Sequence, residues 1–182
     1  MIKNDIIKKW INSDELFLVL MKSSRCSKDN KKYNKEEHEL LEKYITNKTT
    51  NQWSNNLGET IVKNILLELK LPVKKPKKKN GFIPDLETND TIYEVKTRNY
   101  TTSGTAGEKI LGCPLKYIDV PKIFNKPLKI VLVAYQEYEA INNFKLFDKE
   151  MSSEKKEILD LYKKFNIEFV KCSDLLKSIK NN

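Results

Sequence analysis

The chain has 182 residues, of which 39% are apolar and 32% charged, so it is long enough to bury one hydrophobic core and is not a wholly disordered chain. Lysine and arginine outnumber aspartate and glutamate by 34 to 25, and the net charge of +9 favours an anionic partner: nucleic acid, an anionic membrane or an acidic protein. No run of about 18 apolar residues could span a bilayer, no signal peptide is indicated, and the three cysteines form no CxxC or zinc pattern. We therefore expect a reduced, cytoplasmic setting without a membrane anchor.

The first part of the chain predicts helices joined by polar loops. Residues 1–50 predict a helical N-terminal extension that contains a basic surface loop. Its His38 is the one histidine of the chain and lies in a charged helix, which disfavours a Ser/His or Cys/His mechanism. After a loop over 46–56, a strongly patterned helix is expected from Leu57 to about residue 71, where Pro72 ends it.

Alternating polar and apolar residues predict a β-hairpin in the middle of the chain. Its strands are expected over 81–87 and 91–98, with a turn at 89–90. The nearly continuous apolar run 128–135 predicts a third strand that is covered on both faces. The expected fold is α/β, a single domain 1–182 with a mixed central β-sheet flanked by helices and a core over 53–182. The remaining elements are expected to be helices over 137–147, 154–165 and 173–179 and a short strand over 167–170.

Three acid and base groups lie on the predicted hairpin. Glu94 and Lys96 alternate with Val95 along one strand and therefore share a face, and the turn returns Asp85 to their neighbourhood. Two carboxylates can hold a hard cation such as Mg²⁺, which lowers the pKa of a bound water and stabilises charge on a phosphate. Lys96 would reach the attacking water or the scissile phosphate. The set suits phosphodiester hydrolysis; the alternative is an ordinary hairpin with a solvated face.

The order Pro84-Asp85, then Glu94-Val95-Lys96, resembles the PD-(D/E)xK motif of the restriction-endonuclease-like nuclease superfamily. This resemblance implies an α-β-β-β-α-β core and Mg²⁺-dependent cleavage of DNA. It also implies that Asp85, Glu94 and the main-chain carbonyl of Val95 hold the metal while Lys96 assists catalysis.

The resemblance covers roughly residues 53–135 and extends to one further candidate ligand. A glutamate near the start of the first core helix often points into such a site, and Glu59 occupies that place. The alternative role of Glu59 is to complement the dipole of its helix from the first turn. The chain is most similar to a type II restriction endonuclease, which implies site-specific cleavage of double-stranded DNA by a homodimer.

Two segments beside the hairpin are candidate DNA contacts. The lysine segment (residues 74–79) would gain affinity by releasing counterions from phosphates, or it is a solubilising loop or a localisation signal. Hydroxyls and glycines over 101–112 make backbone amides available to phosphate, or only permit a tight turn. No Walker spacing is present, so no nucleotide cofactor is expected. Glu108 is a candidate partner of Lys96. The expected DNA-binding residues are Lys77, Lys78, Lys79, Arg98, Thr102, Ser103, Thr105 and Lys109.

Two other functions remain open. A structure-specific or repair nuclease such as a Holliday-junction resolvase has the same glutamate, PD and ExK elements, although such resolvases are usually shorter and lack a segment like 1–50. A non-catalytic nucleic-acid-binding module would have no need of an intact Asp85, Glu94 and Lys96 set. A membrane-surface protein is disfavoured, because the lysines are spread over loops and not along one face of an amphipathic helix.

Overall fold

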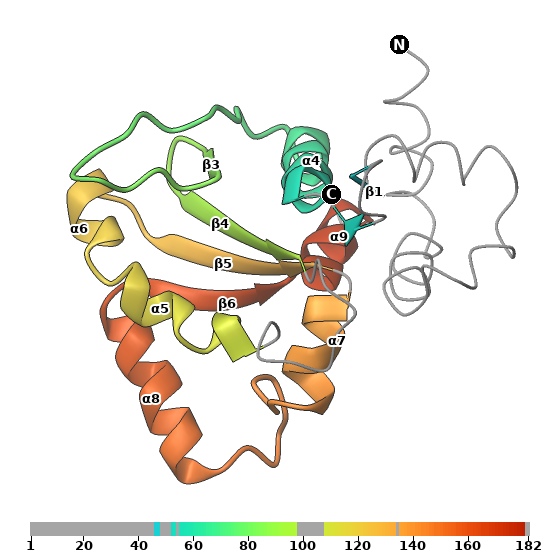
Figure 1. The fold of residues 1–182 in the computed structure, drawn as a ribbon, viewed down its shortest axis with the longest axis vertical. Helices are drawn as coiled ribbons and strands as arrows, with labels where there is room; N and C mark the ends of the chain where they lie inside the picture. Colours follow the sequence, from blue (N-terminus) through green and yellow to red (C-terminus); the bar gives the residue numbers. More distant parts are fainter. Residues whose placement is uncertain (1–45, 48–51, 54, 98–107, 134, 181–182) are drawn as a thin grey trace, which may run out of the picture.

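The computed structural model describes residues 46–47, 52–53, 55–97, 108–133 and 135–180. Within them, a four-stranded β-sheet is flanked by helices, which confirms the α/β class with a mixed central sheet (Figure 1). The expected helical extension lies outside the described residues, apart from the two-residue strand β1 (Thr46–Asn47). None of the described helices combines the length and the apolar character needed to cross a bilayer.

The secondary structure agrees with the predicted order and differs at the ends of elements. β1 pairs antiparallel with β2 (Gln52–Trp53), where the sequence predicted only a loop, because a pair of two-residue strands leaves no detectable alternation. The remaining elements are α4 (Asn55–Glu68), β3 (Leu86–Glu87), β4 (Ile92–Thr97), the 3-10 helix η2 (Glu108–Ile110), α5 (Cys113–Lys116), α6 (Val120–Phe124), β5 (Leu128–Val133), α7 (Tyr135–Asn142), α8 (Ser153–Lys164), β6 (Ile167–Lys171) and α9 (Cys172–Lys180).

The predicted hairpin is present and forms one edge of the sheet, but its first strand covers only Leu86–Glu87 and not the expected 81–87. β3 and β4 are antiparallel, with Leu86 opposite Tyr93. The amide of Thr88 donates to the Thr91 carbonyl over 2.9 Å, and the amide of Thr91 donates to Thr88 Oγ1 over 3.2 Å, which leaves 89–90 exposed at the tip. β5 runs parallel to β4, and β6 runs parallel to β5, so the strand order is β3-β4-β5-β6.

The side chains of β4 alternate between two hydrophobic layers on opposite faces of the sheet. Tyr93 and Val95 join the layer covered by α4 and α9. Ile92 joins the layer under α5, α6, α7 and α8. Because Glu94 shares the face of Ile92, its carboxylate is enclosed on the side of α5.

The end of α4 directs the chain back along the hairpin. Lys70 has a left-handed φ of 58°, and the amide of Leu71 donates to the Leu66 carbonyl over 3.0 Å, which is a Schellman-type ending. Pro72 then prevents the helix from continuing. Two residues later, Lys74 pairs with Glu87 in an antiparallel bridge, so the start of the lysine segment runs beside β3.

A close contact at Gly58 sets the distance between α4 and β4. A Cβ atom added to Gly58 would lie 1.8 Å from Thr97 Oγ1, closer than real atoms approach, and 3.2 Å from Val95 Cγ1, which is a tight contact. Any other residue at this position would push the helix away from the strand. The neighbouring Glu59 is thereby held beside the end of β4.

We expect Gly58→Ala to lower the free energy of unfolding by about 1–3 kcal/mol, the usual cost of overpacking. Urea denaturation followed by circular dichroism would measure it. Gly112→Ala is the matched control, since its φ of −83° suits any residue and its added Cβ meets no atom within 4 Å. The control should change stability by no more than about 0.5 kcal/mol, and equal losses in the two variants would contradict the close contact.

Candidate active site

The hairpin brings Asp85 beside Glu94, as the sequence predicted. Asp85 immediately precedes β3, and its amide donates to the Tyr93 carbonyl over 3.1 Å. Its side-chain Oδ2 accepts a hydrogen bond of 2.7 Å from the amide of Val95. These two bonds fix the Asp85 carboxylate next to the part of β4 that carries Glu94.

Glu94 is 3% exposed, and its two oxygens have different surroundings. Oε1 accepts hydrogen bonds from Lys96 Nζ over 2.5 Å and from the Tyr117 hydroxyl over 2.7 Å. Oε2 is buried and has no hydrogen-bond partner among the described residues. A buried acceptor without a partner costs on the order of 1–3 kcal/mol, and more when it is charged. A cation at Oε2 would remove this cost.

The oxygen atoms at this position fit Mg²⁺. The ion is usually held by one or two carboxylates, with water and substrate phosphate completing its octahedron. Asp85 and Glu94 supply the carboxylates, and Val95 adjoins both, following Glu94 in the chain and donating its amide to Asp85. Within the described part of the chain, no group of three or more His, Cys, Asp and Glu side chains is placed to hold a metal. The candidate ligands are therefore these two carboxylates and the Val95 carbonyl.

Burial dominates the electrostatics of the site. Burial raises the pKa of the Asp85 carboxyl, although the hydrogen bond from the Val95 amide lowers it. The negative charge of Glu59 raises this pKa further. Burial also raises the pKa of Glu94. The positive charge of Lys96 lowers this pKa, and the negative charge of Asp85 raises it. Burial alone would lower the pKa of Lys96, but its carboxylate neighbours, led by Glu94, outweigh this and raise it. Lys96 is accordingly an ammonium beside two carboxylates that resist ionisation.

Glu59 reaches the site from α4. Its carboxylate acts on the charge of Asp85, and its Oε2 lies 3.5 Å from Lys75 Nζ. The predicted helix start at Leu57 is two residues late, because α4 begins at Asn55 and has no acidic residue in its first turn. The helix-dipole role considered for Glu59 therefore does not apply, and its charge acts on Asp85 instead.

Tyr117 and Cys113 belong to the site but were not identified as functional from the sequence. The Tyr117 hydroxyl donates a hydrogen bond to Glu94, and the centroid of its ring lies 5.8 Å from Lys96 Nζ. Cys113 is buried close enough to act on the charge of Lys96, and burial raises the pKa of its thiol to about 12. No local spacing marks either residue. Glu108 is exposed on η2, and the ion pair of Lys96 is made with Glu94.

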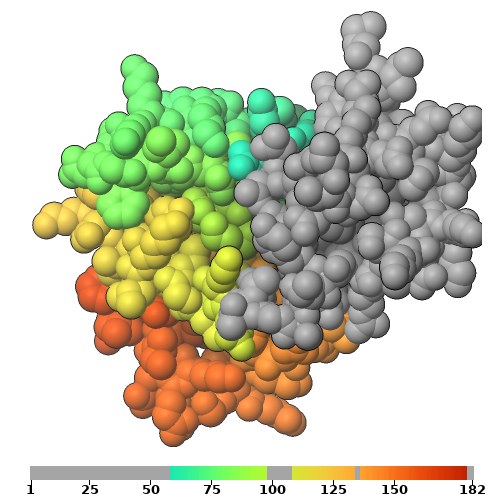
Figure 2. Space-filling view, in the orientation of Figure 1, coloured from blue at the N-terminus to red at the C-terminus, as the bar shows by residue number. Residues whose placement is uncertain are grey.

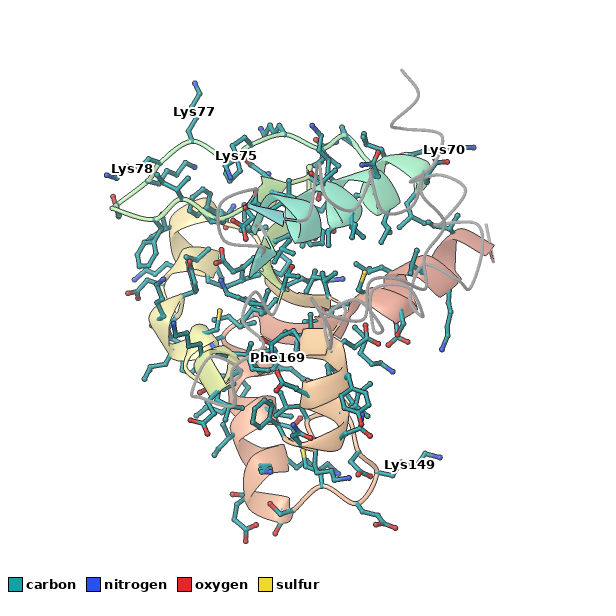
Figure 3. All side chains as sticks on the ribbon, turned by 45° about the vertical axis from the view of Figure 1, so that its right-hand side comes forward. Lys70, Lys75, Lys77, Lys78, Lys149 and Phe169 are labelled. Atoms are coloured by element: carbon teal, nitrogen blue, oxygen red, sulfur yellow. The ribbon has the colours of Figure 1, made fainter. Side chains whose placement is uncertain are left out.

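The lysine segment is exposed next to the site. Lys77 and Lys78 point away from the body of the molecule in Figure 3. Lys79 lies over the ring of Phe124 in α6, with 5.0 Å from Nζ to the ring centroid. Figure 2 shows the segment (green) adjoining α5 and α6 (yellow) on one face. Lys109 is exposed on η2. Four other expected DNA contacts, Arg98, Thr102, Ser103 and Thr105, lie outside the described residues.

Comparison with known proteins identifies no relative. No protein-family model matches the chain, and neither the curated proteins nor the solved structures give a significant match. A functional assignment therefore depends on the side chains that the hairpin, α4 and α5 bring together.

The raised pKa of Asp85 predicts a dependence of stability on pH. Because the folded protein holds this proton more tightly than the unfolded chain, stability falls as pH rises from the ordinary value of 3.8 through the raised value. The loss then persists at neutral pH. Asp85→Asn keeps an oxygen for the Val95 amide, so in EDTA at pH 7 it should raise the free energy of unfolding by about 0.5–2 kcal/mol.

The gain from Asp85→Asn should disappear as pH falls below 3.8, where both states are protonated. Urea unfolding over a series of pH values would test this. Asp90→Asn, at the exposed tip of the hairpin, is the matched control and should show no gain. A gain that is the same at every pH would contradict the electrostatic explanation.

Proposed function

We propose that this protein is a Mg²⁺-dependent endodeoxyribonuclease with a PD-(D/E)xK active site. The observation that carries the proposal is the adjacency of Asp85 and Glu94, with one buried Glu94 oxygen lacking a partner among the described residues and Lys96 bonded to the other. Buried neighbouring carboxylates cost stability and repel phosphate. A module that only bound nucleic acid would gain nothing from them, whereas a metal-dependent nuclease requires them.

The order of elements supports a restriction-endonuclease-like core. α4 is followed by the bridge at Lys74, then by β3 and β4, by the crossover helices α5 and α6, and by the parallel strand β5. This order corresponds to α-β-β-β-α-β, although its first strand is a single bridged residue. In the proposed fold, β6, α8 and α9 extend the core beyond β5.

Each residue of the proposed site has a definite task. Asp85, Glu94 and the Val95 carbonyl hold Mg²⁺, with Glu59 as an outer ligand. Bound Mg²⁺ supplies an activated water and stabilises charge on the phosphate. Lys96 is partly buried and protonated, so it can donate to the attacking water or to a phosphate oxygen.

The proposed substrate is double-stranded DNA. The exposed lysine segment provides positive charge that a phosphate backbone requires, and its Lys75 acts on the charge of Asp85. Lys109, exposed on η2, adds a further positive charge. By analogy with type II restriction endonucleases, the protein acts in the cytoplasm as a homodimer that cuts at a specific sequence, each active site cutting one strand. A structure-specific or repair nuclease uses the same site and differs in its substrate.

Asp85→Ala and Glu94→Ala should each reduce cleavage of long duplex DNA by more than about 100-fold, because each removes a metal ligand. DNA binding should persist, since a repulsive charge is lost. A gel assay with Mg²⁺ and with EDTA would measure cleavage, and Glu157→Ala, on the exposed face of α8, is the charge-matched control. Undiminished cleavage in either site variant would exclude the site assignment.

The products distinguish the substrate classes. Discrete Mg²⁺-dependent bands would support a sequence-specific endonuclease, and a smear would favour a nonspecific or repair nuclease. Intact duplex would direct the assay to junction and flap substrates. Failure to cut those as well would favour the binding module.

Replacing Lys77, Lys78 and Lys79 with Gln should weaken binding to all duplex sequences alike. Each lost phosphate contact should reduce the slope of log affinity against log salt by about 0.9. Fluorescence anisotropy with DNA in EDTA over a salt series would measure the slope. The triple control changes the exposed Lys149, Lys156 and Lys164 to Gln; Lys149 lies at the opposite end of the molecule (Figure 3). Equal slopes for the two triple variants would show that only net charge matters.

A further inference from the structure

We infer that Tyr117 is a positioning residue of the proposed metal site, holding Glu94 Oε1 by a hydrogen bond so that Oε2 is left for the cation. This inference rests on the proposed function. Tyr117 directly follows α5, far from β4 in the chain, and it determines which oxygen of the Glu94 carboxylate faces the metal.

The distribution of hydrogen bonds around Glu94 carries the inference. Oε1 accepts from both Lys96 and Tyr117, whereas Oε2 is buried and accepts from no described residue. The two oxygens of a carboxylate are chemically equivalent, and the terminal torsion of glutamate is soft. Lys96 alone does not distinguish them, because its long side chain starts two residues away on the same strand and can follow the carboxylate. Tyr117 is the donor that makes the oxygens inequivalent.

The phenol of Tyr117 is fixed by elements other than β4. Tyr117 is 8% exposed and follows the last residue of α5, with its amide donating to the Cys113 carbonyl over 3.1 Å. The centroid of its ring lies 6.0 Å from the centroid of the Phe82 ring and 4.9 Å from Lys116 Nζ. The ring has only two side-chain torsions, so these contacts determine where the hydroxyl lies. The ring is thus held by Phe82 and Lys116 in addition to Lys96 of β4.

The hydroxyl is a donor throughout the physiological pH range. A carboxylate oxygen can only accept a hydrogen bond, so the Tyr117 hydroxyl is the donor to Glu94 Oε1. A phenol that keeps its proton can only donate to a carboxylate, and it offers no base for a reacting water. Tyr117 therefore acts through Glu94 and is not itself a catalytic residue.

Tyr117→Phe removes the hydroxyl and keeps the ring. Binding of Mn²⁺, a stand-in for Mg²⁺ with a similar preference for oxygen ligands, can be measured by calorimetry on the full chain without DNA. We expect the variant to bind Mn²⁺ about 10–100-fold more weakly than the unaltered protein, as is typical when a group that orients a ligand is lost. Cleavage by the variant should recover at high Mg²⁺. Tyr93→Phe, buried on the opposite face of β4, is the matched control and should bind Mn²⁺ normally.

The outcomes separate this inference from the proposed function. Normal Mn²⁺ affinity in Tyr117→Phe would overturn the positioning role and leave the nuclease proposal standing. Failure of the unaltered protein to bind Mn²⁺, with or without DNA, would overturn both. A loss of cleavage that saturating Mg²⁺ does not restore would also overturn the positioning role. Phe82→Ala, which removes the support of the ring but keeps the hydroxyl, is the second variant if Tyr117→Phe does not fold, and unchanged Mn²⁺ affinity in it would contradict the inference.

Discussion

The hydrogen bond from the Val95 amide to Asp85 Oδ2 joins the register of the hairpin to the chemistry of the site. A slip of one residue in an antiparallel pair turns every side chain to the opposite face. Here such a slip would move Glu94 into the layer that contains Tyr93 and Val95, away from Tyr117. The turn over 88–91 and the Asp85 carboxylate hold the register from its two sides, so the acid that would bind a metal also helps to define the strand pairing on which the site depends.

The site lies in a part of the sheet whose apolar packing offsets the free-energy cost of burying a carboxylate. Glu94 lies on a strand whose Ile92, Tyr93 and Val95 belong to the two hydrophobic layers. The neighbouring strand β5 is buried along nearly its whole length. Burying an acid there is unfavourable, and Lys96 with Tyr117 compensates only one of its oxygens. The apolar contacts of β4 and β5 therefore maintain an arrangement that the carboxylates alone would not favour. Side chains that lower the stability of the fold are expected at functional sites.

The sequence predicts those features that depend on local spacing. The hairpin and the adjacency of Asp85 and Glu94 follow from a period of two and a turn signal, and the buried strand β5 follows from its apolar run. The contact between Glu94 and Tyr117 joins residues 23 positions apart. It depends on where α5 lies after the crossover, and no periodicity encodes that position. The start of α4 was misplaced for a simpler reason: Asn55 and Asn56 carry no apolar pattern, although helical backbone already begins there.

The charge distribution around the hairpin implies that metal and DNA binding are coupled in the proposed nuclease. Without a cation, Asp85 and Glu94 repel a phosphate that the lysine segment attracts, so the two parts of the site act against each other. A divalent cation bound to the carboxylates turns their repulsion of the phosphate into an attraction. The attraction between the phosphate and the lysine segment is unchanged. Each ligand then strengthens the binding of the other by the same factor, as linkage requires. The ion pair between Lys75 and Glu59 connects the two parts, because Lys75 belongs to the lysine segment and the charge of Glu59 acts on Asp85. In the proposed nuclease, the same carboxylates that weaken the isolated fold would thus make retention of DNA depend on the metal needed to cut it.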